Sequence, residues 1–245
     1  MTIHGKQKIK KSDFFPRAAC LLLFFLFLSF EIIAGELKIG ERLVYDVKLG
    51  MLSAGIQFVC VADKVKIGDH ETYRITSHTS TNPFFSIFYR MDNYIESFLD
   101  CETFSIRKMT KEINEGNFHR KDIVLFDPES GKGFIQRDGY AETINIPSAV
   151  LDIASIPYYL RNLELKIGQV ISMEIITDRG IKKYTAIVES IEQIKTPLMK
   201  FRAYKVVEKT EKITIWIAND ENRLPVKIQI GTNIGEITGI LKKAE

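Results

Sequence analysis

Short segments in which apolar residues alternate with other residues follow one another along most of this chain, and this repetition constrains the fold more than any other feature. Leu43, Tyr45, Val47 and Leu49, for example, fall on one face of an extended strand. Val, Ile, Tyr, Phe and Thr dominate these segments, and glycine, Asn-Asp and proline signals separate them. The pattern predicts strands at 42–49, 55–65, 71–77, 93–99, 104–113, 118–126, 170–177, 183–194, 201–209, 212–218, 224–230 and 236–241.

Two segments depart from the β pattern. Pro147-Ser148 can begin a helix that runs to Asn162, with Ser148 as its N-cap and Pro157 as a point of kinking or restart. The segment 82–89 is expected to form a second, short helical or irregular piece. We therefore predict a mainly β domain, built as a single curved antiparallel sheet or a barrel-like sheet with one covering helix at about 148–162.

The first 34 residues have the organisation of a signal peptide. A cluster of lysines and Arg17 precedes the apolar run 18–30, which is too short to span a bilayer comfortably. Ala34 offers a small residue at the cleavage position. We predict a leader at 1–34 and a single β-rich domain at 35–245, exported to the periplasm or cell envelope. An uncleaved N-terminal anchor is the alternative.

The leader also accounts for the formal net charge of +3. It holds five basic and two acidic residues, which leaves 29 basic (34 less 5) and 29 acidic (31 less 2) residues in the rest of the chain. The content of 45% hydrophobic and 27% charged residues is that of a globular protein. A formally neutral mature chain without a one-sided basic stripe argues against nucleic-acid binding.

The two cysteines outside the leader allow two interpretations. In an oxidising compartment Cys60 and Cys101 could form one disulfide, which would stabilise the fold by roughly 4 kcal/mol in the chain-entropy model. Reduced cysteine also packs as a small hydrophobic side chain, so two buried free thiols are the alternative.

The motifs of the common enzyme classes are missing from the sequence. It has no glycine-rich phosphate loop, no serine between the flanking glycines of a nucleophile elbow and no paired-histidine zinc motif. His70, His78 and His119 have no recognisable metal-ligand spacing. We therefore expect neither catalysis nor a metal or cofactor.

Aromatic residues are the candidate ligand contacts. Phe84, Phe85 and Phe88 lie between two predicted strands, where a loop is normally polar. Three further candidates are Tyr158, Tyr159 and Arg161, at the end of the predicted helix, and a fourth is Trp216, the only tryptophan. These side chains could form the wall of a site for an apolar ligand, or they could fill the core, since aromatic side chains bury large areas.

Four blocks of the sequence, in order, share a pattern with one protein family. They are GERLVYDV at 40–47, DNYIESFLD at 92–100, VLDIASIPYYLR at 150–161, and IWIAND with RLPVKI at 215–220 and 223–228. The set resembles the domain of unknown function 3108 (DUF3108) family of exported bacterial proteins. The resemblance implies a β-rich domain in the cell envelope and no assigned catalytic residue. Cys60 and Cys101 are not part of the pattern.

Three functions follow as hypotheses. The first is a non-enzymatic envelope protein that binds an apolar or amphipathic molecule, such as a lipid, on the concave face of its sheet. The second is a structural module that binds an envelope protein partner through an edge strand or the helix. The third is a hydrolase or transferase acting on an envelope polymer, with Asp152, Ser155, Tyr159 or Arg161 in its site.

Overall fold

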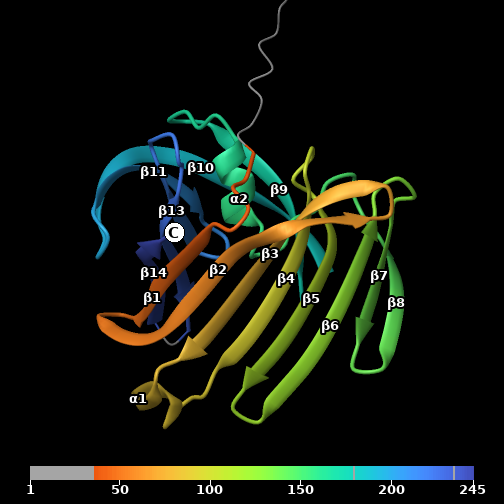
Figure 1. Cartoon of the computed structure of the whole chain (residues 1–245), viewed down its shortest axis with the longest axis horizontal. Helices are drawn as coiled ribbons and strands as arrows, with labels where there is room; N and C mark the ends of the chain where they lie inside the picture. The colour runs from red at the N-terminus through yellow and green to blue at the C-terminus, as the bar shows by residue number, and fades with distance from the viewer. Residues whose placement is uncertain (1–35, 179, 234) are drawn as a thin grey trace, which may run out of the picture. The chain divides into compact units, whose positions relative to one another are not determined.

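The strands form one antiparallel sheet (Figure 1) in the computed structural model, which describes residues 36–178, 180–233 and 235–245. The first eight strands are β1 (Arg42–Leu49), β2 (Leu52–Ile67), β3 (His70–Thr81), β4 (Asp92–Asp100), β5 (Ile106–Glu115), β6 (Phe118–Asp127), β7 (Lys132–Arg137) and β8 (Tyr140–Asn145). The other six are β9 (Val170–Thr177), β10 (Gly180–Lys195), β11 (Lys200–Glu208), β12 (Ile213–Ala218), β13 (Pro225–Thr232) and β14 (Gly235–Ala244). The predicted fold class is confirmed.

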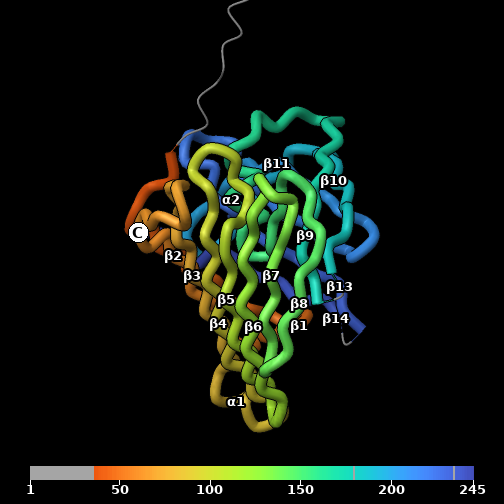
Figure 2. The backbone as a smooth tube through the Cα atoms, turned by 90° about the vertical axis from the view of Figure 1, so that its right-hand side faces the viewer, coloured from red at the N-terminus to blue at the C-terminus, as the bar shows by residue number. Residues whose placement is uncertain are grey.

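The order of the strands is β8-β7-β6-β5-β4-β3-β2-β1-β14-β13-β12-β11-β10-β9. Every strand except β8 and β9 pairs with both of its neighbours in the chain or, for β1 and β14, with one neighbour and with each other in the middle of the sheet. The edge strands β8 and β9 are consecutive along the chain but stand at opposite ends of the order, so the sheet is not closed into a barrel. Figure 2 shows β4–β8 side by side in front of α2.

The segment that leads from β8 to β9 connects the two halves of the sheet. The carbonyl of Val150 accepts a hydrogen bond of 2.8 Å from the N–H of Ile106 in β5, and its own N–H donates to Ser105 Oγ at 2.8 Å. The next residue, Leu151, forms two backbone hydrogen bonds with β9, of 2.8 and 2.9 Å. The adjacent residues Val150 and Leu151 therefore form hydrogen bonds to β5 on one side and to β9 on the other.

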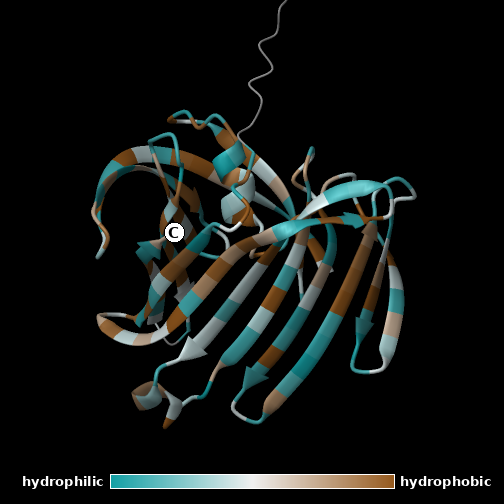
Figure 3. Ribbon diagram, in the orientation of Figure 1, coloured by the Kyte–Doolittle hydropathy of each residue, from teal (hydrophilic) through white to brown (hydrophobic). Residues whose placement is uncertain are grey.

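Alternation along the strands determines which side chains enter the core. In β9, Ile171, Met173 and Ile175 are buried, whereas Val170 and Ser172 are exposed. Figure 3 shows the resulting alternation of apolar and polar residues along neighbouring strands. Buried apolar residues gather in three clusters, one under β2–β7, one between α2 and β9–β12, and one across β1 and β11–β14.

Two short helices, α1 (Pro83–Ser86) and α2 (Ile156–Asn162), interrupt the sheet. The expected short piece at 82–89 corresponds to α1, but the predicted start of the second helix at Ser148 is wrong. Residues 148–155 belong instead to the segment that crosses from β8 to β9, which we call the crossing segment. Pro157 lies in the first turn of α2, where its missing N–H breaks no helical hydrogen bond. Among the described residues, no helix is long and apolar enough to cross a membrane.

Two strands are absent from the sequence-based prediction. Both β7 and β8 are only six residues long, and β8 exposes nearly all of its side chains. An exposed edge strand needs no apolar face, so its sequence lacks the alternation by which the other strands are recognised.

Removing the hydrogen bond between Ser105 and Val150 tests how much the crossing segment stabilises the fold. Ser105→Ala leaves the buried N–H of Val150 without its acceptor, so we expect the free energy of unfolding to fall by about 1–3 kcal/mol. Urea unfolding followed by the fluorescence of Trp216 measures the change. Ser130→Ala in the exposed β6–β7 turn is the matched control and should stay within about 0.5 kcal/mol of the parent protein. Equal losses in both variants would contradict a special role for Ser105.

Candidate functional site

A cavity of about 480 Å³ lies between the two halves of the sheet. One wall comes from β4–β7, the opposite wall from β9–β13, and residues 152–160 cover it between them. Aliphatic side chains and methionines make up most of the lining: Ile95, Met109, Val124, Ile135, Ile153, Ile156, Leu160, Met173, Ile175, Ile176, Ala186, Val206, Ile213, Ile215 and Ile230. The volume lies in the range of about 300–1,000 Å³ that is common for small-molecule sites.

Asp152 lies at the wall of this cavity and is itself 1% exposed. Its carboxylate accepts hydrogen bonds from Ser97 Oγ and, at 2.7 Å, from the N–H of Ser155. Burial raises the pKa of Asp152, and these hydrogen bonds offset only part of that rise. The carboxyl group therefore holds its proton to a higher pH than an exposed aspartate does.

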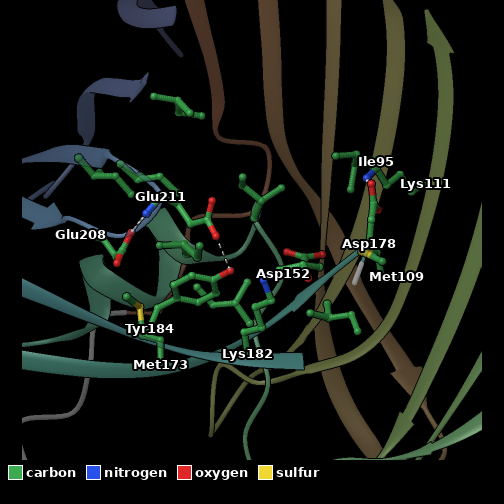
Figure 4. A pocket seen from close by; sticks show the side chains of 18 of the residues that line it. Ile95, Met109, Lys111, Asp152, Met173, Asp178, Lys182, Tyr184, Glu208 and Glu211 are labelled. Atoms are coloured by element: carbon green, nitrogen blue, oxygen red, sulfur yellow. Dashed lines mark hydrogen bonds and ion pairs between the residues drawn. The ribbon is translucent and has the colours of Figure 1, made fainter. Parts of the chain in front are cut away.

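The ion-paired groups of the lining gather around the tip of the β9–β10 hairpin, whereas Glu208 and Glu211 line the cavity from the end of β11 and the turn that follows it. Asp178 lies 3.2 Å from Lys111 Nζ and 2.6 Å from an Arg120 guanidinium nitrogen. Asp122, which is buried, pairs with Arg120 at 3.2 Å and with Arg137 at 2.9 Å. Burial opposes the ionisation of Asp178, but Lys111 and Arg120 outweigh it, and the pKa of Asp178 is lowered. Figure 4 shows Lys111 and Asp178 together on one side of the cavity, with Tyr184 and Glu211 on the other.

The aromatic residues predicted as ligand contacts do not come together. Phe84 and Phe88 are 62% and 74% exposed and stack edge-on with ring centroids 5.6 Å apart in the α1 region. Phe85 is half-buried beside them. In Figures 1 and 2 this group lies at the opposite end of the sheet from α2. None of the three is among the described residues that line the cavity.

The other predicted contacts have structural partners. Tyr158 is buried in the core under β2–β7, and the half-buried Tyr159 packs against it. Arg161 forms a bidentate pair with Glu41, at 2.6 and 2.9 Å, which ties α2 to the beginning of β1. Trp216 is buried in the core of β1 and β11–β14 and donates to Glu192 at 2.9 Å. Like the phenylalanines, these four do not line the cavity in the described part of the chain.

Of the two interpretations of the cysteines, the disulfide does not hold, because Cys60 and Cys101 are free thiols. Cys60 lies on β2 opposite Thr76 of β3, and Thr76 lies opposite Glu96 of β4, five residues before Cys101. Two strand spacings of about 5 Å and several residues along the strand separate the cysteines by more than the roughly 7 Å that a disulfide tolerates between Cα atoms. Burial raises the pKa of the Cys101 thiol.

Sequence reasoning missed the lining of the cavity, although one signal was present. Tyr184, Ala186 and Val188 form a buried row on β10, and Lys182 continues that row by the same two-residue step. The alternation predicts that these side chains share one face of β10, but it does not predict which strands lie opposite that face. Within the described residues, no group of His, Cys, Asp and Glu is arranged to hold a metal ion.

The fold and the cavity define a class of protein: an open, barrel-like antiparallel sheet with a mostly apolar interior site. The chain belongs to the family described as protein of unknown function DUF3108, whose model matches residues 44–242. The sequence resemblance is thereby confirmed. No curated protein matches the sequence.

Solved structures with a similar fold show low sequence identity. A β-barrel-like protein of the DUF1849 family from Brucella abortus has a TM-score of 0.55 and 10% identity, over 86% of this chain and 99% of that chain. A candidate exported protein with a YmcC-like fold from Bacteroides fragilis has a TM-score of 0.31 and 10% identity, over 87% and 99%. A candidate lipoprotein from Parabacteroides distasonis has a TM-score of 0.30 and 12% identity, over 85% and 96%. The first of these supports the barrel-like fold.

Two of the aspartates that line the cavity, Asp152 and Asp178, should affect stability in opposite directions as pH changes. The raised pKa of Asp152 means that the folded protein keeps a proton that the unfolded chain releases above the ordinary carboxyl value of 3.8. This contribution to stability is complete below that value and is lost as pH rises through the raised pKa. We therefore expect the stability of Asp152→Asn, relative to the parent protein, to improve as pH rises from about 4.

Asp178→Asn is the matched control with the opposite sign. The lowered pKa of Asp178 contributes stability above the ordinary carboxyl pKa, and that contribution is lost as pH falls. The relative stability of this variant should therefore worsen as pH rises. Urea unfolding across the pH range measures both differences, and parallel pH profiles for the two variants would contradict the assignment.

Proposed function

We propose that this protein acts after export, in the bacterial cell envelope, as a non-enzymatic binding protein that holds an apolar or amphipathic molecule such as a lipid. The observation that carries the proposal is the cavity of about 480 Å³ between the two halves of the sheet. The leader at 1–34, which lies outside the described residues, supports the location.

The composition of the cavity wall favours an apolar guest over a polar one. A sugar or peptide needs several converging hydrogen-bonding groups, whereas the middle of this cavity is lined by side chains such as Ile135, Val206 and Ile215. Each square ångström of apolar surface that a ligand removes from water here contributes about 25 cal/mol. A small barrel-like fold can also fill its interior with its own side chains, and here the interior retains room for a ligand.

The arrangement around Asp152 also favours binding over catalysis. Ser155 Oγ donates to the carbonyl oxygen of Asp152 and accepts from its N–H, each at 2.9 Å. The hydroxyl group is therefore engaged with backbone groups and not with a base that would activate it as a nucleophile. Arg161 is held by Glu41 and is not among the cavity-lining residues of the described chain. Of the four residues considered for an envelope-polymer hydrolase, only Asp152 lines the cavity in the described chain.

Filling the cavity should abolish binding without unfolding the protein. Ala186→Phe on β10 and Met109→Trp on β5 place extra volume in the cavity from opposite walls. We expect each to weaken the binding of a fluorescent fatty-acid analogue at least tenfold, which corresponds to about 1.4 kcal/mol. Fluorescence titration measures the binding, and circular dichroism confirms the fold.

Thr185→Phe is the matched control, because Thr185 is the neighbour of Ala186 on the same strand and is exposed on the opposite face. This variant should bind the analogue as the parent protein does. Unchanged binding in both cavity variants, or equal losses in all three, would contradict the cavity as the binding site.

A further inference from the structure

Ion pairs gather at one end of the cavity. Lys111 and Arg120 share the carboxylate of Asp178, and Arg120 and Arg137 share that of Asp122. The β9–β10 tip lies at this end, and the side chain of Asp178 there is 55% exposed. These ion pairs therefore lie where the apolar cavity meets water.

Lys182 adds a further positive charge to this end. It lies opposite Ile175 in the β9–β10 register and shares its face with Tyr184 and Ala186, all of which line the cavity. No ion pair involves Lys182 within the described part of the chain. Figure 4 shows its side chain extending from β10 among the lining residues. Its apolar stem follows the wall, and its ammonium group is left available to a ligand.

Three other carboxylates of the lining accept hydrogen bonds from groups other than Lys182. Glu208 accepts hydrogen bonds from the N–H groups of Thr210 and Glu211, at 2.8 and 2.7 Å, within the β11–β12 turn. Glu211 accepts from the hydroxyl group of Tyr184 at 3.2 Å. Asp152 accepts from Ser97 and Ser155. Each acid therefore has hydrogen-bond donors of its own. Among the lysines and arginines that line the cavity in the described chain, Lys111 and Arg137 form ion pairs and Lys182 does not.

We infer that the ligand is an anionic amphiphile, whose single acidic head group pairs with Lys182 while its apolar chain occupies the aliphatic part of the cavity. This inference rests on the proposed function and names the class of its ligand. A lysine is a point charge on a flexible stem, so it can receive a carboxylate or a phosphate ester equally well. Because the site adjoins a low-dielectric interior, the pair is stronger there than on an open surface.

Lys183 provides a matched control for the test. It is the next residue on β10, is exposed like Lys182, and lies opposite Glu174 on the face that does not line the cavity. Lys182→Glu and Lys183→Glu change the net charge of the protein by the same amount. Only the first reverses the charge at the cavity, so long-range electrostatic effects cancel in the comparison. Lys182→Met removes the charge and keeps an apolar stem.

The experiment compares three probes with the same chain: hexadecanoic acid, hexadecyl phosphate and hexadecan-1-ol. Binding to the full protein is measured by isothermal titration calorimetry at concentrations below micelle formation. We expect the two anionic probes to bind about tenfold more tightly than the alcohol, as one charge-assisted hydrogen bond allows. Lys182→Glu and Lys182→Met should remove that preference, so that the anions bind no more tightly than the alcohol. Lys183→Glu should retain the preference.

The outcomes separate the two proposals. If none of the three probes binds, the proposed function and this inference both fail. If the alcohol binds as tightly as the anions, or if Lys182→Glu retains the preference for anions, the inference fails and the binding function stands. A preference that is lost in the Lys182 variants and kept in Lys183→Glu supports the inference. The better of the two anionic probes then identifies the head group as a carboxylate or a phosphate.

Discussion

The architecture depends on one short connection, in which Val150 and Leu151 form hydrogen bonds to different halves of the sheet. The chain must pass from β8 to β9, which are the two edges of the sheet, and the backbone of these residues pairs with β5 on one side and β9 on the other. Backbone groups buried away from water must be paired. Separating the halves would therefore leave several of these groups without partners. The cavity exists because this connection holds β4–β7 opposite β9–β13.

Asp152 follows directly after this connection, and its side chain serves the same purpose. Its carboxylate accepts from Ser97 in β4 and from the backbone N–H that precedes α2, so it links a strand of one half to the start of the helix. Asp152 is 1% exposed, and this burial raises the pKa of its carboxyl group. The same group forms part of the cavity wall, so the structural role of Asp152 also places a proton-binding group beside the cavity.

The sequence could predict the strands but not how they assemble. Alternation in β1 and β9 gives their bounds directly, as 42–49 and 170–177. The edge strand β8 has no buried face to reveal it, and the start of α2 is hidden because Ser148 resembles an N-cap as well as Ser155 does. The pairing of β1 with β14 is a contact between the two ends of the described chain, which no local pattern encodes.

The same limit applies to the candidate site. Large aromatic residues such as Phe88 and Trp216 are conspicuous in a sequence, but the first is exposed near α1 and the second is buried in a separate core. The cavity is lined by ordinary aliphatic residues, which a sequence cannot distinguish from a packed core. Lys182 is recognisable only once the row of Tyr184 and Ala186 is known to face a space and not another layer of side chains.

The two ends of the cavity are held by interactions of different strength. Near α2, the halves of the sheet are joined by buried backbone hydrogen bonds at Val150 and Leu151. At the β9–β10 tip, the contact between them includes the ion pairs of Asp178 with Lys111 and Arg120, and the side chain of Asp178 is 55% exposed. Ion pairs at a solvent-exposed end are screened by salt, so salt weakens the contact at the tip more than it weakens the buried hydrogen bonds near α2. Under the proposed function, a ligand would enter beside Lys182, and an anionic head group that follows its apolar chain inward would come to rest near this lysine.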